Sequence, residues 1–515
     1  LSNRARHPIR LDTFQPPLQG PLDDALRELV QAGFIDFNLM IPWVEQLSAC
    51  TVAELRTMCG LANLPSTGRK EDLVSKLSAV EEDRPTAPAL ISLRHRPLFR
   101  RINRAYLLDH EGDMTRVVMS ELGLRKRVQY AVTGGPGRFR NRGDLRGYES
   151  ALKRFRTPLL HIDPKRTAAL ALDKLASAPL AIDYRWRFSE HRFIERHLLR
   201  TARALERLKQ HEDAVAIYAA ALQHPVRQKT EFTHRLALSL GRLERYREGS
   251  ELCAKSRHGG SDAYRLIRTG KRLAQKAGTA WTGNALPAKP TPVSVQLPYS
   301  IVESKWLTDA GLVSVETAVI EHLKHQKRTA FHAENGLWTT LFGLLFDEAL
   351  FAPVPGMLPN PYLRAPLDLG TAGFVERRRE IIQKILAEIG CASANRRLSE
   401  AFNNRRGQHI AGVSWQYFPL PFLEAVLENT PPPAMVFIME QFVRDWRYAA
   451  KGLPDLVVLP DSNPHSTRND FPNELFLVEV KGPSDSLRDQ QHWWIGQLTD
   501  KGIPTQLWHV RPKSG

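Results

Sequence analysis

Two short apolar segments near the C-terminus, residues 456–459 and 475–480, constrain the fold most. Both are rich in Val and Leu and are bounded by Pro or Gly, which predicts strands that enter a core. Asp455 precedes the first strand, and Glu479 and Lys481 end the second. Because side chains two residues apart project from the same face of a strand, Glu479 and Lys481 should lie together. Charged groups at the end of an apolar strand must be paired, hydrated or bound to a metal.

This pattern predicts a site for a divalent cation. Two carboxylates that are brought together repel each other unless a cation sits between them. Asp455, Glu479 and the backbone carbonyl of Val480 supply the oxygen ligands that Mg²⁺ or Mn²⁺ prefers. A cation held there activates water and stabilises charge on a phosphate, and Lys481 is placed to orient that water. The predicted chemistry is hydrolysis of a phosphodiester bond.

The charge of the chain points to a polyanionic partner. The formal net charge is +17 over 515 residues. Residues 91–160 hold 16 Lys and Arg against 6 Asp and Glu, so 16 − 6 = +10 lies in this stretch. Such clustering is typical of a phosphate-binding face. The alternative is an evenly basic protein that has no anionic partner.

Several classes of protein are disfavoured by the sequence. The four cysteines form no CxxC pair, which argues against a zinc finger and against a disulfide scaffold. No apolar run approaches the ~20 residues of a membrane span, and the first ten residues contain no apolar h-region of a signal peptide. The Gly-rich stretch 134–143 lacks the Gly-Lys-Ser/Thr ending of a P-loop, so ATP-driven chemistry is not supported.

Residues 47–78 predict two helices that flank a turn. Thr51 and Glu54 form a capping box at the first helix, Leu64-Pro65 ends it, and Gly68 allows the turn before the second. This segment resembles the SAP motif, a small DNA-binding module. A generic helical hairpin is the alternative.

Residues 190–258 contain a repeat with a period of 35. The pairs Leu205/Leu240 and Ala214/Gly249 illustrate it. Helical repeats near ~34 residues are of the tetratricopeptide (TPR) type, and the sequence loosely resembles that family. A plain helical bundle is the alternative. In either case the expected role is scaffolding.

The C-terminal motif resembles a known nuclease signature. Pro454-Asp455 with Glu479-Val480-Lys481 resembles the PD-(D/E)xK nucleases, and the flanking residues 452–456 and 478–483 resemble their VRR-NUC branch. With the SAP-like and repeat segments, and the segment 332–351, the whole chain resembles the Fanconi-associated nucleases. The resemblance implies an α+β multidomain protein with a restriction-endonuclease-like α/β core. It comprises an N-terminal helical region (1–90), a basic helical DNA-binding region (91–180), TPR-like repeats (181–285), a linker (286–298) and a nuclease domain (299–515).

The resemblance also implies a function and further residues. The expected activity is 5′ flap endonuclease and 5′–3′ exonuclease cleavage of branched DNA in interstrand-crosslink repair. Glu334, on a helix expected over 332–351, should join the metal site. The predicted DNA contacts are Arg69, Lys70, Arg125, Lys126, Arg127, Arg138, Arg140, Arg142, Arg447 and Arg488.

Some properties of the family are expected to be missing or remain open. No cysteine set could build the ubiquitin-binding zinc finger of eukaryotic members. Gln490 stands where a lysine of a 5′-phosphate pocket is expected, which leaves that pocket open. The chain is expected to be a monomer with no membrane association, cytoplasmic and nucleoid-associated in a bacterium, or nuclear in a eukaryote. A Holliday-junction resolvase or restriction-type enzyme, and a non-catalytic DNA-binding scaffold, are the alternatives.

Overall fold

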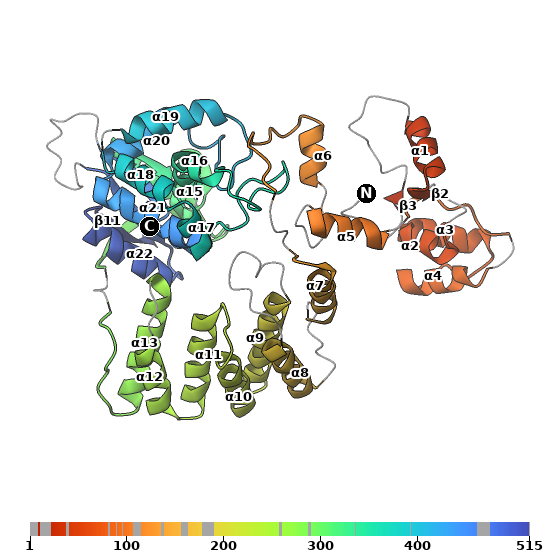
Figure 1. Ribbon diagram of the computed structural model, residues 1–515, viewed down its shortest axis with the longest axis horizontal. Helices are drawn as coiled ribbons and strands as arrows, with labels where there is room; N and C mark the ends of the chain where they lie inside the picture. The colour runs from red at the N-terminus through yellow and green to blue at the C-terminus, as the bar shows by residue number, and fades with distance from the viewer. Residues whose placement is uncertain are drawn as a thin grey trace. The chain divides into compact units, whose positions relative to one another are not determined.

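The computed structural model divides the chain into two compact units, residues 1–125 and 126–515, each of which we describe by itself (Figure 1). The structure describes residues 9–10, 22–37, 41–80, 83–88, 90–94, 96–106, 115–134, 139–155, 163–177, 190–256, 260–286, 290–334, 336–391, 393–460 and 474–513. The boundary after Arg125 falls inside the basic region 91–180, so that region is not one domain.

The first unit combines helices with a small antiparallel sheet. Strands β1 (Ile9–Arg10), β3 (Leu90–Leu93) and β2 (Ile35–Phe37) pair in that order. The region over 1–90 is helical as expected, and it also contributes strands to this small sheet. The helices of this unit are α1 (Leu22–Gln31), α2 (Trp43–Ala49), α3 (Val52–Leu61), α4 (Lys70–Ser78), α5 (Arg96–Tyr106) and α6 (Thr115–Glu121).

Helices α3 and α4 form the hairpin predicted over 47–78. The capping box is present: the Glu54 amide donates to the Thr51 hydroxyl, and the Thr51 amide donates to the Glu54 carboxylate at 2.7 Å. Gly68 turns the chain at φ +127°, which glycine adopts most readily. The apolar faces of both helices are buried, in a cluster that includes Leu55 and Leu73.

The second unit begins with residues 126–134, which we call the strap. The strap contains no helix, contrary to the helical reading of 91–180. It lies along the C-terminal domain: Thr133 donates its amide to the Leu358 carbonyl at 3.0 Å, and the Tyr130 hydroxyl donates to the Asn360 carbonyl at 2.8 Å. Backbone pairing to a distant segment thus replaces the helix that composition suggested.

A row of antiparallel helices follows the strap (Figure 1). Lys209 and Glu244 both adopt a positive φ, near +61° and +62°, in the turns that follow helices α9 and α11. These turns are 35 residues apart, which is the period of the sequence repeat. The helices are α7 (Arg142–Phe155), α8 (Pro164–Ser177), α9 (His191–Arg207), α10 (His211–Leu222), α11 (Lys229–Arg242), α12 (Tyr246–Lys255) and α13 (Gly260–Lys276).

The C-terminal domain is built on a five-stranded mixed sheet. The strand order is β4 (Pro292–Leu297), β11 (Thr505–Pro512), β10 (Phe476–Lys481), β9 (Leu456–Leu459) and β8 (Thr329–His332). Strands β4, β11 and β10 are parallel, whereas β9 and β8 alternate in direction. The segment 286–298, expected as a linker, therefore supplies an edge strand. Pro292 is tolerated because it is the first residue of that strand.

One end of this sheet gathers the predicted site residues, and we call it the carboxylate edge. Strand β10 ends there at Lys481, β9 begins there after Asp455, and β8 ends there before Glu334. Strand β4 also ends on this side, because it is parallel to β10.

A second, three-stranded sheet follows β4. Its strands are β5 (Tyr299–Ser300), β6 (Lys305–Thr308) and β7 (Gly311–Val313), in antiparallel order. Helix α14 (Val315–His325) then covers one face of the main sheet through a cluster that contains Val319, Val478 and Val480. The even-numbered side chains of β10 thus face α14, and Glu479 and Lys481 face the other side.

The remaining helices surround the sheet. They are α15 (Gly336–Leu345), α16 (Asp347–Leu350), α17 (Ala372–Arg377), α18 (Arg379–Ile389), α19 (Ala394–Arg405), α20 (Leu420–Asn429), α21 (Pro432–Ala449) and α22 (Asp489–Asp500). Helix α13 of the repeats packs against α22, where Tyr264 stacks on His492 and Arg268 lies 2.9 Å from Asp489 (Figure 1). Among the described helices, none is both long and apolar enough to cross a bilayer.

Candidate active site

Asp455 is held by backbone hydrogen bonds at the carboxylate edge. Its carboxylate accepts from the Val480 amide at 2.8 Å, which ties β9 to the end of β10. Its carbonyl accepts from the amides of Ala333 and Glu334, at 2.8 and 3.2 Å. Burial raises the pKa of Asp455 to about 6, although the Val480 amide and Lys481 act in the opposite direction.

Glu479 and Lys481 lie side by side, as the strand periodicity predicts. Lys481 Nζ is 2.6 Å from Glu479 Oε1, and the Glu479 side chain is fully buried. Burial and the negative charge of Asp455 raise the pKa of Glu479 to about 8, against the influence of Lys481. One ammonium therefore faces two buried carboxyl groups, which leaves the cluster short of positive charge.

Glu334 reaches the cluster from a turn, so its expected position on a helix is wrong. Strand β8 ends at His332 and helix α15 begins at Gly336, and Glu334 lies between them with an exposed side chain. The sequence 332–351 contains a strand end, this turn and helices α15 and α16. The negative charge of Glu334 contributes to the raised pKa values of both Asp455 and Glu479.

Sequence reasoning missed one further carboxylate, Glu316. It lies in the first turn of α14, after the N-cap Ser314, and its charge also raises the pKa of Asp455. A cap followed by an acidic residue is a common helix start. Only the topology shows that this helix begins near the carboxylate edge.

The chemistry of this cluster fits a hard divalent cation. Glu479 Oε1 contacts the Lys481 ammonium, whereas the buried Oε2 has no hydrogen-bond partner among the described residues. A buried carboxylate oxygen without a partner is costly, and a second cation beside Lys481 would offset that cost. Within the described ranges, no group of three or more His, Cys, Asp or Glu side chains is spaced to hold a metal ion by itself. A metal at this edge would need ligands besides side chains, such as a carbonyl or water.

The turn before Asp455 is fixed by helix α22. Gly452 adopts φ +75°, and a Cβ there would lie 2.9 Å from Gln490 Cγ. Gln490 donates to the Tyr448 carbonyl at 2.8 Å, and Trp494 donates to the Lys451 carbonyl at 3.0 Å. Gln490 therefore holds the chain that leads into Asp455, which accounts for an uncharged residue at this position.

The predicted DNA contacts are spread over both units. Arg69 is exposed at the start of α4, and the Lys70 ammonium donates to the Ser48 carbonyl at 2.9 Å. Arg125 ends the first unit, and Lys126 and Arg127 begin the strap, all three exposed.

The other predicted contacts lie further along the second unit. Arg140 pairs with Asp144 at 3.0 Å, and Arg142 is exposed at the start of α7. Arg488 caps α22 and is exposed. Arg138 and the side chain of Arg447 lie outside the described residues. The role of the whole set as DNA contacts stays a prediction.

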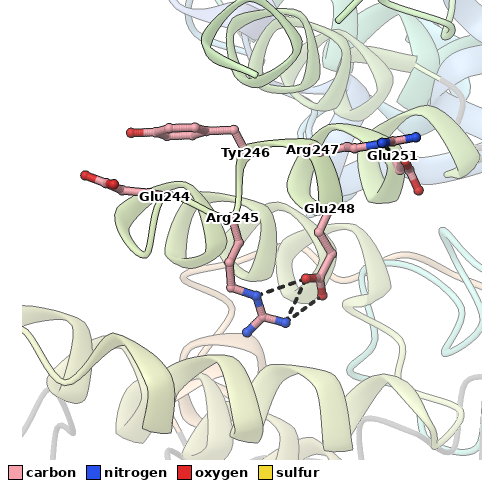
Figure 2. Close-up of a pocket in the computed structure, with 6 residues that line it drawn as sticks. All are labelled: Glu244, Arg245, Tyr246, Arg247, Glu248 and Glu251. Carbon is pink, nitrogen blue, oxygen red and sulfur yellow. Dashed lines mark hydrogen bonds and ion pairs between the residues drawn. The ribbon is translucent and has the colours of Figure 1, made fainter. Parts of the chain in front are cut away.

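A shallow pocket on the repeats is not part of this site. Figure 2 shows it at the turn between α11 and α12, where Arg245 lies 2.7 Å from Glu248. Arg247 likewise pairs with Glu251 at 3.1 Å. Since these charges neutralise one another, the pocket offers no reactive group. Its lining residues are Glu244, Arg245, Tyr246, Arg247, Glu248 and Glu251.

Comparison with known protein families agrees with the geometry of the carboxylate edge. Residues 391–512 match the VRR-NUC domain family. The matched range contains Asp455, Glu479 and Lys481, whereas Glu334 lies upstream of it.

Individual proteins extend the likeness to the whole chain. The Fanconi-associated nuclease 1 homolog of Arabidopsis thaliana is 26% identical over 558 residues, which cover 98% of this chain and 61% of that protein. The homolog of Pseudomonas aeruginosa is 31% identical over 198 residues, which cover 38% of this chain and 34% of that protein. This chain thus spans less than two thirds of the length of these relatives. The predicted resemblance to the Fanconi-associated nucleases is confirmed.

The fold is shared with a solved structure. The crystal structure of paFAN1 bound to 2nt 5′flap DNA with gap superposes with a TM-score of 0.76 at 22% identity. The match covers 99% of this chain and 89% of that one. The predicted multidomain α+β fold, with helical N-terminal regions and a C-terminal nuclease-type core, is confirmed.

Proposed function

We propose that this chain is a structure-specific DNA repair nuclease that hydrolyses phosphodiester bonds in branched DNA. The observation that carries the proposal is the buried Asp455–Glu479 pair with Lys481, inside a matched VRR-NUC domain. The likeness to the Fanconi-associated nucleases, and to a fold whose crystals contain 5′ flap DNA, favours 5′ flap and 5′–3′ exonuclease cleavage in interstrand-crosslink repair.

The cofactor we propose is Mg²⁺ or Mn²⁺. Asp455, Glu479 and the Val480 carbonyl would hold it, with Glu334 as a further carboxylate from the β8–α15 turn. Such an ion lowers the pKa of bound water and stabilises charge on a phosphate. Hard cations prefer the carboxylate, carbonyl and water oxygens that this edge offers.

Lys481 has two roles in this proposal. Its ammonium offsets part of the carboxylate charge, and it orients the attacking water beside the scissile phosphate. The basic residues predicted as DNA contacts would grip phosphates, which fix position without reading sequence. We propose that the protein works as a monomer on chromosomal DNA, in the bacterial cytoplasm or the eukaryotic nucleus.

The test is cleavage of a panel of end-labelled substrates with Mg²⁺ and with Mn²⁺. The panel comprises a 5′ flap, a 3′ flap, a four-way junction and linear duplex. The wild-type protein should cut the 5′ flap fastest, and Asp455→Asn and Lys481→Ala should bind the flap without cutting it. The exposed Glu380→Gln in α18 serves as the matched control and should cut normally. Preferred cutting of the four-way junction by a dimer would instead indicate a resolvase, and absence of cutting by the wild type would contradict the proposal.

A further inference from the structure

The turn between β5 and β6 exposes two adjacent aliphatic side chains. Ile301 is 84% exposed and Val302 is 91% exposed. Single exposed apolar residues are ordinary on a protein surface. Two adjacent β-branched residues at the tip of a hairpin are not, because Gly, Asn, Asp and Ser dominate tight turns.

The turn does not need these side chains for its own geometry. Ser304 takes the left-handed conformation at φ +51°, and the Glu303 amide donates to the Ser300 hydroxyl at 3.3 Å. Ile301 and Val302 therefore add apolar surface where local structure gains nothing from it. Departures from local sequence preference of this kind are expected at functional sites.

The base of the hairpin is anchored rigidly in the core. Trp306 is buried and packs edge-on against Tyr299, with ring centroids 4.8 Å apart. Trp306 belongs to the buried cluster that contains Val480, the residue between Glu479 and Lys481, and Tyr299 packs against that cluster. The base of the hairpin and strand β10 of the carboxylate edge thus share one hydrophobic core.

The topology places the hairpin at the same end of the sheet as Lys481, on the face that α14 covers, whereas the Lys481 side chain leaves the opposite face. Lys481 is in register with His509 of β11, which is in register with Ser294 of β4. Strands β11 and β4 continue three residues further, to Pro512 and Leu297, about 10 Å at ~3.3 Å per residue. The chain enters β5 from this end. About three base-pair rises of ~3.4 Å span the same distance.

Basic side chains surround the hairpin at this end. Lys305 begins β6, and Arg511 and Lys513 lie at the end of β11, all three exposed. The acidic groups nearby are Glu303 and Asp309, and Asp309 lies 3.4 Å from His325. The balance favours phosphates around an apolar tip. Proteins that kink or unstack DNA combine these two features, with basic contacts flanking an inserted aliphatic side chain.

We propose that the Ile301–Val302 tip is a wedge that packs against the terminal base pair at a DNA branch and unstacks it. This inference rests on the proposed function, because it assigns a specificity role beside the same site. The wedge separates the strand to be cut from its partner, and Lys305, Arg511 and Lys513 hold the backbone. The occupant of the apolar tip is thus a nucleobase.

The direct test measures base unstacking without cleavage. 2-Aminopurine is placed at the branch of a 5′ flap, and binding is followed in the Asp455→Asn background. Binding should raise its fluorescence several-fold, and Ile301→Ser/Val302→Ser should remove most of that rise at saturating protein. Ile301→Leu/Val302→Leu keeps the tip apolar and should retain the rise in fluorescence. Leu208→Ser removes another exposed aliphatic residue, on the repeats, and should change nothing.

Cleavage provides the second readout. The serine double variant should cut a fully paired flap about tenfold more slowly than wild type. Its cleavage rate should return to the wild-type value on a flap whose two branch-proximal base pairs are mismatched, because no unstacking is then required. Equal fluorescence and equal rates in the serine and wild-type proteins would overturn the proposal and leave the tip to a protein partner. That result would not touch the nuclease assignment, which fails only if the wild type cuts no substrate.

Discussion

Two glutamates of this chain, the half-buried Glu231 in the repeats and the fully buried Glu479 in the sheet, have opposite electrostatic surroundings. Burial raises the pKa of each, but three arginines outweigh that effect at Glu231 and lower its pKa to about 2. At Glu479 burial and a second carboxylate raise the pKa to about 8. The arginines at Glu231 include Arg265, whose Nη1 lies 2.8 Å away.

The difference separates an acid that neighbouring arginines compensate from an acid whose neighbours leave it short of positive charge. Glu231 has more positive charge around it than it needs, so its negative charge stabilises the helical repeats. Glu479 shares one ammonium with Asp455, so its charge is destabilising until another cation arrives. Both residues are glutamates whose pKa burial raises, although the Glu231 side chain is 19% exposed and the Glu479 side chain is fully buried. The balance of neighbouring charge is what makes Glu479, and not Glu231, the candidate for a functional role.

The largest expected difference between the two glutamates is in catalysis. Glu479→Gln should slow flap cleavage about 10³-fold, because losing a metal ligand removes several kcal/mol of transition-state stabilisation. Glu231→Gln should leave the rate per folded molecule within about twofold. Single-turnover kinetics on a 5′ flap measure both rates. Similar losses of cleavage rate in the two variants would contradict the assignment of different roles to Glu479 and Glu231.

Glu231→Gln, which should hardly affect catalysis, should instead lower the folding stability. Glu231→Gln leaves Arg203, Arg235 and Arg265 facing one another and should cost about 3 kcal/mol at pH 7. Since the folded pKa lies below the unfolded value, this contribution is present above about pH 4.5 and is lost as the pH falls toward about 2. Urea unfolding should therefore show a smaller difference in unfolding free energy between wild type and Glu231→Gln at pH 4 than at pH 7. A difference that grows in acid would contradict the assignment.

Removing the Glu479 charge should stabilise the metal-free protein. Its folded pKa is raised, so its contribution is favourable below about pH 4.5 and is lost as the pH rises toward about 8. Glu479→Gln should therefore gain about 2 kcal/mol at pH 8 and little at pH 5. Thermal melts in a chelator measure this effect. A destabilised variant at pH 8 would show that Glu479 is already neutralised within the fold.

The smallest effect is expected at Gly452, which positions Asp455. Gly452→Ala should cost about 1–2 kcal/mol, from the positive φ and from the contact with Gln490. Flap cleavage should fall several-fold as Asp455 shifts. Adding Gln490→Ala removes the contact with Cγ, but the contacts with Cβ and the backbone carbon of residue 490, at 3.1 and 3.2 Å, and the backbone strain remain, so it should restore only a small part of the activity. Wild-type cleavage kinetics in Gly452→Ala would mean that the turn at Gly452 does not determine the position of Asp455.

The sequence predicted the local arrangement at the carboxylate edge because the signals for that arrangement are local. The apolar strands, the two-residue spacing of Glu479 and Lys481, and the capping box at Thr51 each depend on neighbours in the chain. The 35-residue repeat appears again in the matching turns at Lys209 and Glu244.

The parts that sequence reasoning missed depend on distant partners. Strand β4 is an edge strand only because β11 pairs with it, and its proline content suggested a linker instead. The strap is fixed by bonds to residues more than 200 positions away. Glu334 looked helical because the strongly apolar α15 follows it directly, and the short β8 before it is weakly apolar. No local pattern brings Glu316 to Asp455.

The most direct test of the central claim is calorimetric titration of Mn²⁺ into the DNA-free protein at pH 7.5. The account predicts saturable binding to the wild type and to Glu231→Gln, and loss of that binding in Glu479→Gln and Asp455→Asn. If Glu479→Gln bound Mn²⁺ as tightly as the wild type, the shortage of positive charge at the carboxylate edge would not be what recruits the metal.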